Sequence, residues 1–237
     1  MKEFRIKILD IDINEYRKKI KELNGKKNHS FLKYVRAIFN RCNATSSSYV
    51  RIKNEDDIVN ITVKIFKGRE KNDRLKEPPE RYDITINQNF ETGRNLLKAL
   101  NLKEKAFQEV YTEKWTLSLN NTSGTLALHG KAKPSGTTSE YTVFFYLAPG
   151  LPIYMEIDCE SKDALDKIIT LLRVEKNKIR LVSFVKLYNE YYDISTNDYL
   201  ESLTFNNIQN ELKPLKNKEL FHNSIKEHKK MINELIN

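Results

Sequence analysis

Charged side chains alternate with apolar ones along five short segments of this chain, and this alternation limits the folds that it can form. The segments are residues 3–8, 49–53, 61–64, 81–86 and 154–158. Successive side chains of a β-strand point to opposite faces, so each segment would present one apolar face and one ionised face. The ionised faces carry arginine, lysine and carboxylates, where an ordinary sheet would carry threonine or serine. The pattern therefore predicts a sheet with its apolar face under helices and its charged faces around a ligand-holding groove or tunnel.

Composition describes a folded chain with an affinity for anions. Of 237 residues, 39% are hydrophobic and 31% charged, and no apolar run approaches the roughly 20 residues of a spanning helix. We therefore expect no membrane association. The formal net charge of +9 favours polyanionic partners such as nucleotides, polyphosphate or nucleic acid, although a lysine-rich surface would explain the net charge alone. Two cysteines, Cys42 and Cys159, and no visible secretory signal predict a reducing, cytoplasmic setting.

The order of the expected elements combines short strands with amphipathic helices. Strands are expected at residues 2–11, 48–54, 58–67, 81–87, 107–119, 124–132, 138–147 and 153–159. Helices are expected at residues 12–23, 31–39, 89–102, 161–172 and 220–236. Asp12 and Glu15 form a capping box, which we favour over a metal-binding pair of Asp10 and Asp12. In the last helix, Phe221, Ile225, Ile232 and Leu235 form the predicted buried stripe.

The residues on the predicted charged face suit a ligand with several negative charges. Arginine grips phosphate through two hydrogen bonds, and lysine acts as a mobile point charge. Glu156 and Asp158, two residues apart on one strand, suit a hard divalent cation such as Mg²⁺ or Mn²⁺. The alternative is an ionic core that compensates its own charges and holds no ligand. The basic members of the face are Arg5, Lys7, Arg51, Lys53, Lys64, Arg81 and Lys114, and the acidic members are Glu3, Asp83, Glu156 and Asp158.

Five motifs in order resemble the CYTH superfamily, the triphosphate tunnel metalloenzymes, which includes class IV adenylyl cyclases, thiamine-triphosphatases and tripolyphosphatases. The likeness covers residues 1–192. The motifs are Glu3-x-Arg5-x-Lys7, Tyr49-Val-Arg51-Ile-Lys53, Ile61-Thr-Val-Lys64, Arg81-x-Asp83-x-Thr85 and the run from Leu147 to Glu156-Ile-Asp158.

The resemblance implies an α+β fold, an eight-stranded antiparallel β-barrel with a charged lumen and helices packed outside. Residues 1–192 would form this tunnel domain, and residues 193–237 a helical C-terminal extension packed on it. It also implies a metal-dependent enzyme that hydrolyses or cyclises a triphosphate-containing small molecule. The implied substrate-binding residues are Arg5, Lys7, Arg51, Lys53, Lys64, Arg81 and Lys114, and the implied metal ligands are Glu3, Glu156 and Asp158.

Departures from the family pattern leave enzymatic activity open. Arg5 replaces the second glutamate of the opening motif, Ala148 stands where the family usually has an aspartate, and Thr85 replaces another acid. With fewer carboxylates, one Mg²⁺ or Mn²⁺ ion at most is expected. The alternative is a catalytically degenerate protein that binds nucleotide or polyphosphate without turnover. A basic nucleic-acid-binding module is a third hypothesis, and the oligomeric state is not predicted.

Other candidate motifs carry less chemistry. The four histidines show no metal-ligand spacing with the cysteines, and His222 and His228 are expected on the surface of the last helix. Residues 130–136 form a basic, glycine-containing hairpin loop without Walker spacing. Trp115 and Leu117 are expected to pack outside the tunnel rather than stack on bases.

Overall fold

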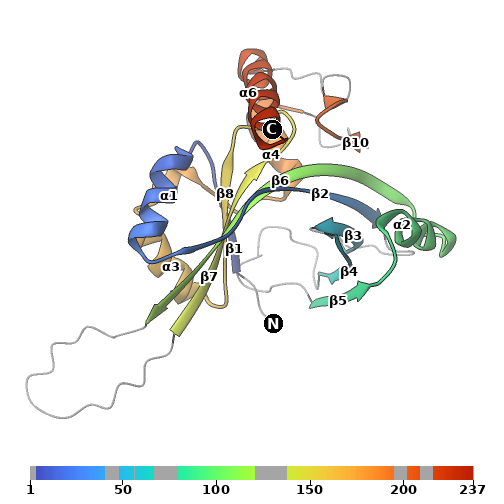
Figure 1. The fold of residues 1–237 in the computed structure, drawn as a ribbon, viewed down its shortest axis with the longest axis horizontal. Coiled ribbons are helices and arrows are strands. Elements are labelled where there is room, and N and C mark those ends of the chain that lie inside the picture. The colour runs from blue at the N-terminus through green and yellow to red at the C-terminus, as the bar shows by residue number, and fades with distance from the viewer. Residues whose placement is uncertain are drawn as a thin grey trace, which may run out of the picture.

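The fold is built on one strongly curved sheet, shown in Figure 1. The computed structural model describes residues 4–40, 48–55, 57–66, 80–120, 138–194, 202–208 and 216–236. Within these residues the strand order is β5-β4-β3-β2-β6-β7-β8-β1-β9, all antiparallel, and β10 pairs in parallel with β6. The strands are β1 (Phe4–Ile8), β2 (Lys26–Asn40), β3 (Tyr49–Glu55), β4 (Ile58–Ile65), β5 (Glu80–Ile86), β6 (Glu104–Asn120), β7 (Thr138–Leu147), β8 (Tyr154–Cys159), β9 (Ile179–Arg180) and β10 (Ser202–Leu203).

Three helices pack on the apolar face of the sheet: α1 (Ile13–Glu22), α2 (Phe90–Ala99) and α3 (Lys162–Leu171). Each begins at the side-chain cap that its sequence indicates, namely Asp12, Asn89 and Ser161, which accept hydrogen bonds from backbone N–H groups of the first turn. The caps satisfy donors that a helix start leaves unpaired. The predicted helices at these three places are confirmed.

The structure contains the two-faced sheet that the alternation in the sequence predicts. Ile6, Ile157 and Val143 are directly opposite one another on β1, β8 and β7, and all are buried under α1 and α3. The intervening residues of the same strands, among them Lys7 and Glu156, share the other face. Because an antiparallel register places paired residues on the same side, one face of the sheet is apolar throughout its centre and the other is charged.

A fourth helix, α4 (Phe184–Tyr192), packs against one end of the charged face. Its Leu187 and Tyr188 belong to a buried cluster with Tyr34 and Tyr154 of the sheet. The Tyr188 hydroxyl donates to the Pro149 carbonyl oxygen at 2.8 Å. The long helix α6 (Lys218–Ile236) adds Phe221 and Ile225 to this cluster; a short 3₁₀ turn, Lys176–Lys178, precedes β9. The division into domains at residues 192 and 193 stays a prediction.

Two expectations about the sheet are wrong. It is not closed into a barrel, since its terminal strands β5 and β9 do not pair, and it has ten strands among the described residues rather than eight. The helix expected at residues 31–39 is part of strand β2. The local spacing of Phe31, Ala37 and Phe39 fits either structure, and pairing with β3 on one side and β6 on the other decides for the strand.

The C-terminal helix differs from its prediction at two residues. His228, expected on the surface, is 1% exposed, because it packs edge-to-face on Phe205. Leu235, expected in the buried stripe, is 40% exposed. Trp115 is buried on the apolar face under α1, as expected. None of the described helices is long and apolar enough to cross a membrane.

Some expectations fall on residues whose placement is not described. They are Glu3, Cys42, the strand at 124–132 and the basic loop at 130–136.

Candidate anion-binding site

The register of the strands places every described residue of the predicted site on one face of the sheet, called the charged face below. Lys64 of β4 lies between Tyr49 of β3 and Arg81 of β5. Lys7 lies opposite Glu156. Further cross-strand neighbours on this face are Arg51 with Thr62, Lys53 with Arg36, Arg5 with Asp158, and Lys114 with Phe144.

On the β1–β8 side of the charged face, acids and bases compensate one another. The Arg5 guanidinium donates from Nε to Asp158 Oδ1 at 2.6 Å and from Nη2 to Oδ2 at 2.5 Å. Arg5 Nε also lies 3.2 Å from Glu156 Oε1, and Lys7 Nζ lies 2.8 Å from Glu156 Oε2. The Tyr146 hydroxyl completes the shell of Glu156 at 3.2 Å. Both carboxylates are therefore already held by fixed cations.

These contacts keep Glu156 ionised although it is buried. Burial acts to raise its pKa, but the charges of Arg5 and Lys7 and the hydrogen bonds from Lys7 and Tyr146 outweigh it, so the pKa lies well below its usual value. Burial and the negative charge of Glu156 in turn raise the pKa of Tyr146 well above its usual value. Tyr146 is therefore a neutral hydrogen-bond donor at ordinary pH.

The other side of the charged face is formed by β2, β3, β4 and β5 and is called the β2–β5 side below. Two of its guanidinium groups have no carboxylate partner among the described residues. Arg36 donates from Nε to Gln108 Oε1 at 2.6 Å and lies over the Phe184 ring of α4, 4.7 Å from its centroid. Arg51 donates only weakly to Thr62 Oγ1, at 3.4 Å, and its buried Nε has no hydrogen-bond partner in the described chain. Leaving such a donor unpaired is costly unless a ligand or water satisfies it.

The other cations of this side are held within the sheet. Lys53 forms an ion pair with Glu55. Arg81 donates to Asp83 at 2.6 Å, and Thr62 donates to the same carboxylate at 2.7 Å. Burial acts to raise the pKa of Asp83, but these hydrogen bonds and the positive charges lower it overall. Arg81 and Lys53 therefore contribute less free positive charge than Arg36 and Arg51.

The pKa of Tyr49 is lowered by the positive groups of the charged face. Burial acts to raise its pKa, yet the charges of Lys64, Arg51, Arg36 and Arg5, in that order, bring it below its usual value. Arg5 is on β1, which four strands separate from β3 in the sheet order. Arg5 nevertheless contributes to this shift, in keeping with the strong curvature of the sheet in Figure 1. Positive groups from four strands thus act on one point.

The residues do not fit a resident divalent metal well. The described chain contains no group of three or more histidine, cysteine, aspartate or glutamate side chains that could hold a metal ion. Glu156 and Asp158 are the described members of the predicted metal site, and the Arg5 guanidinium binds both of them. A metal ion there would have to displace Arg5. Binding of Mg²⁺ or Mn²⁺, with Glu3 as a further ligand, stays a prediction.

Sequence reasoning missed Arg36 and Tyr34. Both lie on β2, which the local pattern made a helix, so they were not placed on the charged face. The sequence nevertheless alternates at this point: Tyr34, Arg36 and Ile38 share one face of the strand, and the buried Ala37 and Phe39 lie on the other. Lys114 was placed on the correct face, and its ammonium lies 5.8 Å from the centroid of the Phe144 ring.

Solved structures share this architecture. A conserved hypothetical protein from Pyrococcus furiosus matches with a TM-score of 0.55 at 16% identity, over 78% of this chain and 99% of that one. The PH1012 protein from Pyrococcus horikoshii OT3 matches with a TM-score of 0.54 at 15% identity, over 78% and 98%. A candidate adenylate cyclase from Vibrio parahaemolyticus matches with a TM-score of 0.55 at 8% identity, over 79% and 97%.

The chain shares the fold of these solved structures. That likeness agrees with the resemblance inferred from the five motifs, and identities this low establish the fold alone. No protein-family model matches the chain, and no curated protein matches it either. The comparisons therefore assign no activity, substrate or metal to this chain.

Proposed function

We propose that this protein binds a ligand with several phosphate groups, a triphosphate, nucleotide or polyphosphate, on its charged face without requiring a divalent metal. The observation that carries the proposal is the pair of guanidinium groups of Arg36 and Arg51, which have no carboxylate partner in the described chain. Arginine matches the geometry of phosphate oxygens, and a polyphosphate would supply the missing charge and the missing acceptor for Arg51 Nε.

The two sides of the charged face would have different roles. The β2–β5 side would hold the phosphates. On the β1–β8 side, Arg5 occupies both carboxylates, so that they do not repel the incoming anion. Tyr146, held neutral, would donate to the ligand or stay on Glu156. Binding by fixed cations alone needs no metal to bridge acid and phosphate.

The test is calorimetry with tripolyphosphate and with ATP in the presence of chelator. We expect wild-type binding, and for Arg51→Gln a loss of affinity of about 10- to 100-fold, since hydrogen bonds to charged groups contribute roughly 1.5–3 kcal/mol. The matched control is Arg94→Gln, which removes an arginine held by Glu104 on the other side of the sheet. Binding that appears only with added metal, or equal losses in both variants, would contradict the proposal.

Metal-dependent turnover is the second candidate, because Glu156 and Asp158 are adjacent carboxylates on one strand. In that case Mg²⁺ or Mn²⁺ would displace Arg5, and the protein would hydrolyse the triphosphate or cyclise a nucleotide. Phosphate release or cyclic nucleotide formation that needs metal and disappears in Glu156→Ala would favour this candidate. Tight, salt-sensitive binding of RNA that Arg51→Gln leaves unchanged would instead favour a nucleic-acid-binding module.

A further inference from the structure

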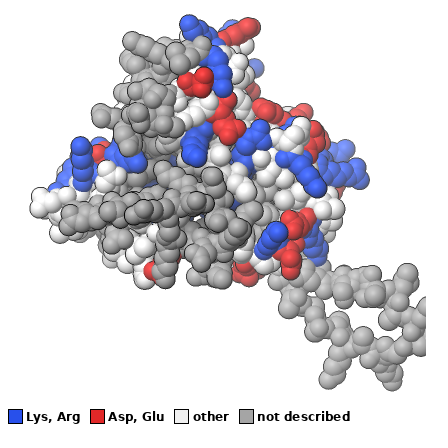
Figure 2. All heavy atoms as spheres, turned by 180° about the vertical axis from the view of Figure 1, so that it is seen from behind, with Lys and Arg blue, Asp and Glu red and all other residues white. Residues whose placement is uncertain are grey.

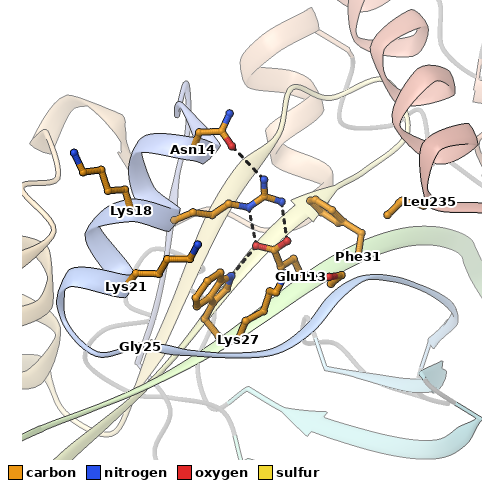
Figure 3. Close-up of a pocket in the computed structure, with 11 residues that line it drawn as sticks. Asn14, Lys18, Lys21, Gly25, Lys27, Phe31, Glu113 and Leu235 are labelled. Carbon is orange, nitrogen blue, oxygen red and sulfur yellow. Dashed lines mark hydrogen bonds and ion pairs between the residues drawn. The ribbon is translucent and has the colours of Figure 1, made fainter.

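A second basic hollow lies on the opposite side of the sheet from the charged face. It is a cavity of about 730 Å³ between α1, the start of β2, β6 and the end of α6, shown in Figure 3. Glu113 and Trp115 line it, and their partners on β7 are the apolar-face residues Phe145 and Val143. The sheet therefore separates this cavity from Arg36 and Arg51.

An irregularity of β2 accompanies the cavity. The pairing of β2 with β6 shifts register between Lys27 and His29 and again between His29 and Leu32. Such bulges bend a strand away from its partner. Gly25 lets β2 begin directly against α1, because a Cβ there would lie 2.8 Å from the Ile20 carbonyl oxygen. The hollow thus follows from the way the chain leaves α1 and enters β2.

The floor of the cavity is a fixed and internally neutral network. Glu113 is only 2% exposed, and its carboxylate accepts hydrogen bonds from Arg17 Nε at 2.9 Å and from Arg17 Nη2 at 2.7 Å. The Trp115 indole donates to the same carboxylate at 2.7 Å, and Arg17 also donates to Asn14 at 3.2 Å. Figure 3 shows these groups converging between α1 and β6. Because Arg17 and Trp115 satisfy Glu113, its charge does not oppose an anion in the cavity.

The rim, in contrast, is positively charged without compensation from acids in the described chain. Lys18, Lys21 and Lys27 line the cavity, and none of them has a carboxylate within ion-pair distance there. Their neighbour Lys19, which does not line the cavity, pairs with Glu15 at 2.7 Å. Figure 3 shows the Lys21 ammonium directed toward the network and that of Lys18 directed away from it. On the face of the molecule seen in Figure 2, Lys and Arg side chains are interspersed with acidic ones.

We propose that this cavity binds a small phosphorylated molecule of mononucleotide size. Lys21 and Lys27 would hold the phosphate as mobile point charges, with Lys18 at the entrance. The edges of Phe31 and Leu235 would contact the apolar part of the ligand. The volume lies within the range of sites for small molecules, and a few polar groups in a partly apolar hollow are the usual composition of such sites. The site is independent of the charged face.

The single tryptophan of the chain makes a direct test available. Trp115 is the only tryptophan and lines the cavity, so its fluorescence reports on this site. We expect AMP, added with chelator, to change the emission and to saturate. The double variant Lys21→Gln/Lys27→Gln should weaken this binding by tenfold or more. Arg51→Gln, on the charged face, should leave it unchanged, which separates this proposal from the proposed function.

The matched control is Lys162→Gln/Lys176→Gln, which removes the same charge from exposed positions that do not line the cavity. Equal weakening by the control pair would mean general attraction of anions and would overturn the proposal. So would an unchanged emission with AMP and inorganic phosphate up to millimolar concentration. A response to single-stranded RNA that AMP does not displace would also overturn it, in favour of a nucleic-acid surface.

Discussion

The substitution Arg5→Gln tests most directly how the charged face replaces a metal ion with a side chain. It removes the guanidinium that binds Asp158 twice and lies 3.2 Å from Glu156, and leaves Lys7 on Glu156 at 2.8 Å. Removing one partner of a fully buried ion pair costs about 3–5 kcal/mol. The Arg5 side chain is 32% exposed, so that solvent screens part of the interaction. We expect a loss of roughly 2 kcal/mol in the free energy of unfolding.

The same substitution should create affinity for a divalent cation. Asp158 loses the guanidinium that binds it, and Glu156 keeps the ammonium of Lys7 and the hydroxyl of Tyr146. With Arg5 gone, the two carboxylates can offer oxygens to a cation. Urea unfolding with and without Mn²⁺ measures this. A metal at a hundredfold excess over its dissociation constant stabilises a protein by about 2.7 kcal/mol. Mn²⁺ should therefore restore the Arg5→Gln variant to near wild-type stability while leaving the wild type almost unchanged.

The matched control is Arg17→Gln, which also removes an arginine held by two hydrogen bonds to a buried carboxylate, Glu113. It should lose similar stability, but Mn²⁺ should not restore it, because one carboxylate is present there instead of two. Wild-type protein stabilised by Mn²⁺ as strongly as Arg5→Gln would refute the reasoning and would support a resident metal at Glu156 and Asp158.

Two further predictions concern the fold. Burial lowers the pKa of His228 from 6.5 to about 4; the Leu151 carbonyl opposes this, although neither ring nitrogen reaches hydrogen-bond geometry. The neutral, buried His228 is therefore favourable above its unfolded pKa, and as the pH falls from 6.5 toward 4 the free energy of unfolding should fall by up to about 3 kcal/mol. His228→Leu should flatten this pH dependence, measured by urea unfolding. An unchanged slope in the variant would contradict the assignment. Gly25→Ala should lower stability by about 1–3 kcal/mol, because a Cβ would meet the Ile20 backbone. Gly93→Ala, whose Cβ meets only the tips of isoleucine side chains, is the control, and equal losses would show that Gly25 is not required.

The sequence predicted the charged face well because a strand's period of two is a local property. The positions of Arg5, Lys7, Arg51, Lys64 and the β8 carboxylates follow from alternation alone, whatever the neighbouring strands are. The cap of α1 at Asp12 is equally local, since a side chain hydrogen-bonds to the next turn of its own helix.

What the sequence could not supply depends on contacts between distant segments. Arg36 was missed because β2 becomes a strand only through pairing with β3 and β6. His228 was misplaced because its burial depends on Phe205, more than twenty residues away in the chain. Closure of the sheet is likewise a property of its whole curvature and not of any segment. The cavity behind α1 arises from a register shift, for which no sequence signal was identified.

The distribution of charge across the charged face explains why binding and metal dependence separate in this protein. In the β1–β8 side, each carboxylate has a fixed cation, so the acids neither attract a metal strongly nor repel an anion. On the β2–β5 side, Arg36 and Arg51 have no carboxylate partner in the described chain, and Arg51 Nε has no acceptor there. Folding must hold these like charges together, so an anion that neutralises them should also stabilise the fold. Tripolyphosphate should raise the midpoint of urea unfolding of the wild type in the presence of chelator and should raise that of Arg51→Gln much less. A wild-type midpoint that tripolyphosphate does not move would mean that the two arginines already have partners, and the case for a metal-free phosphate site would fail.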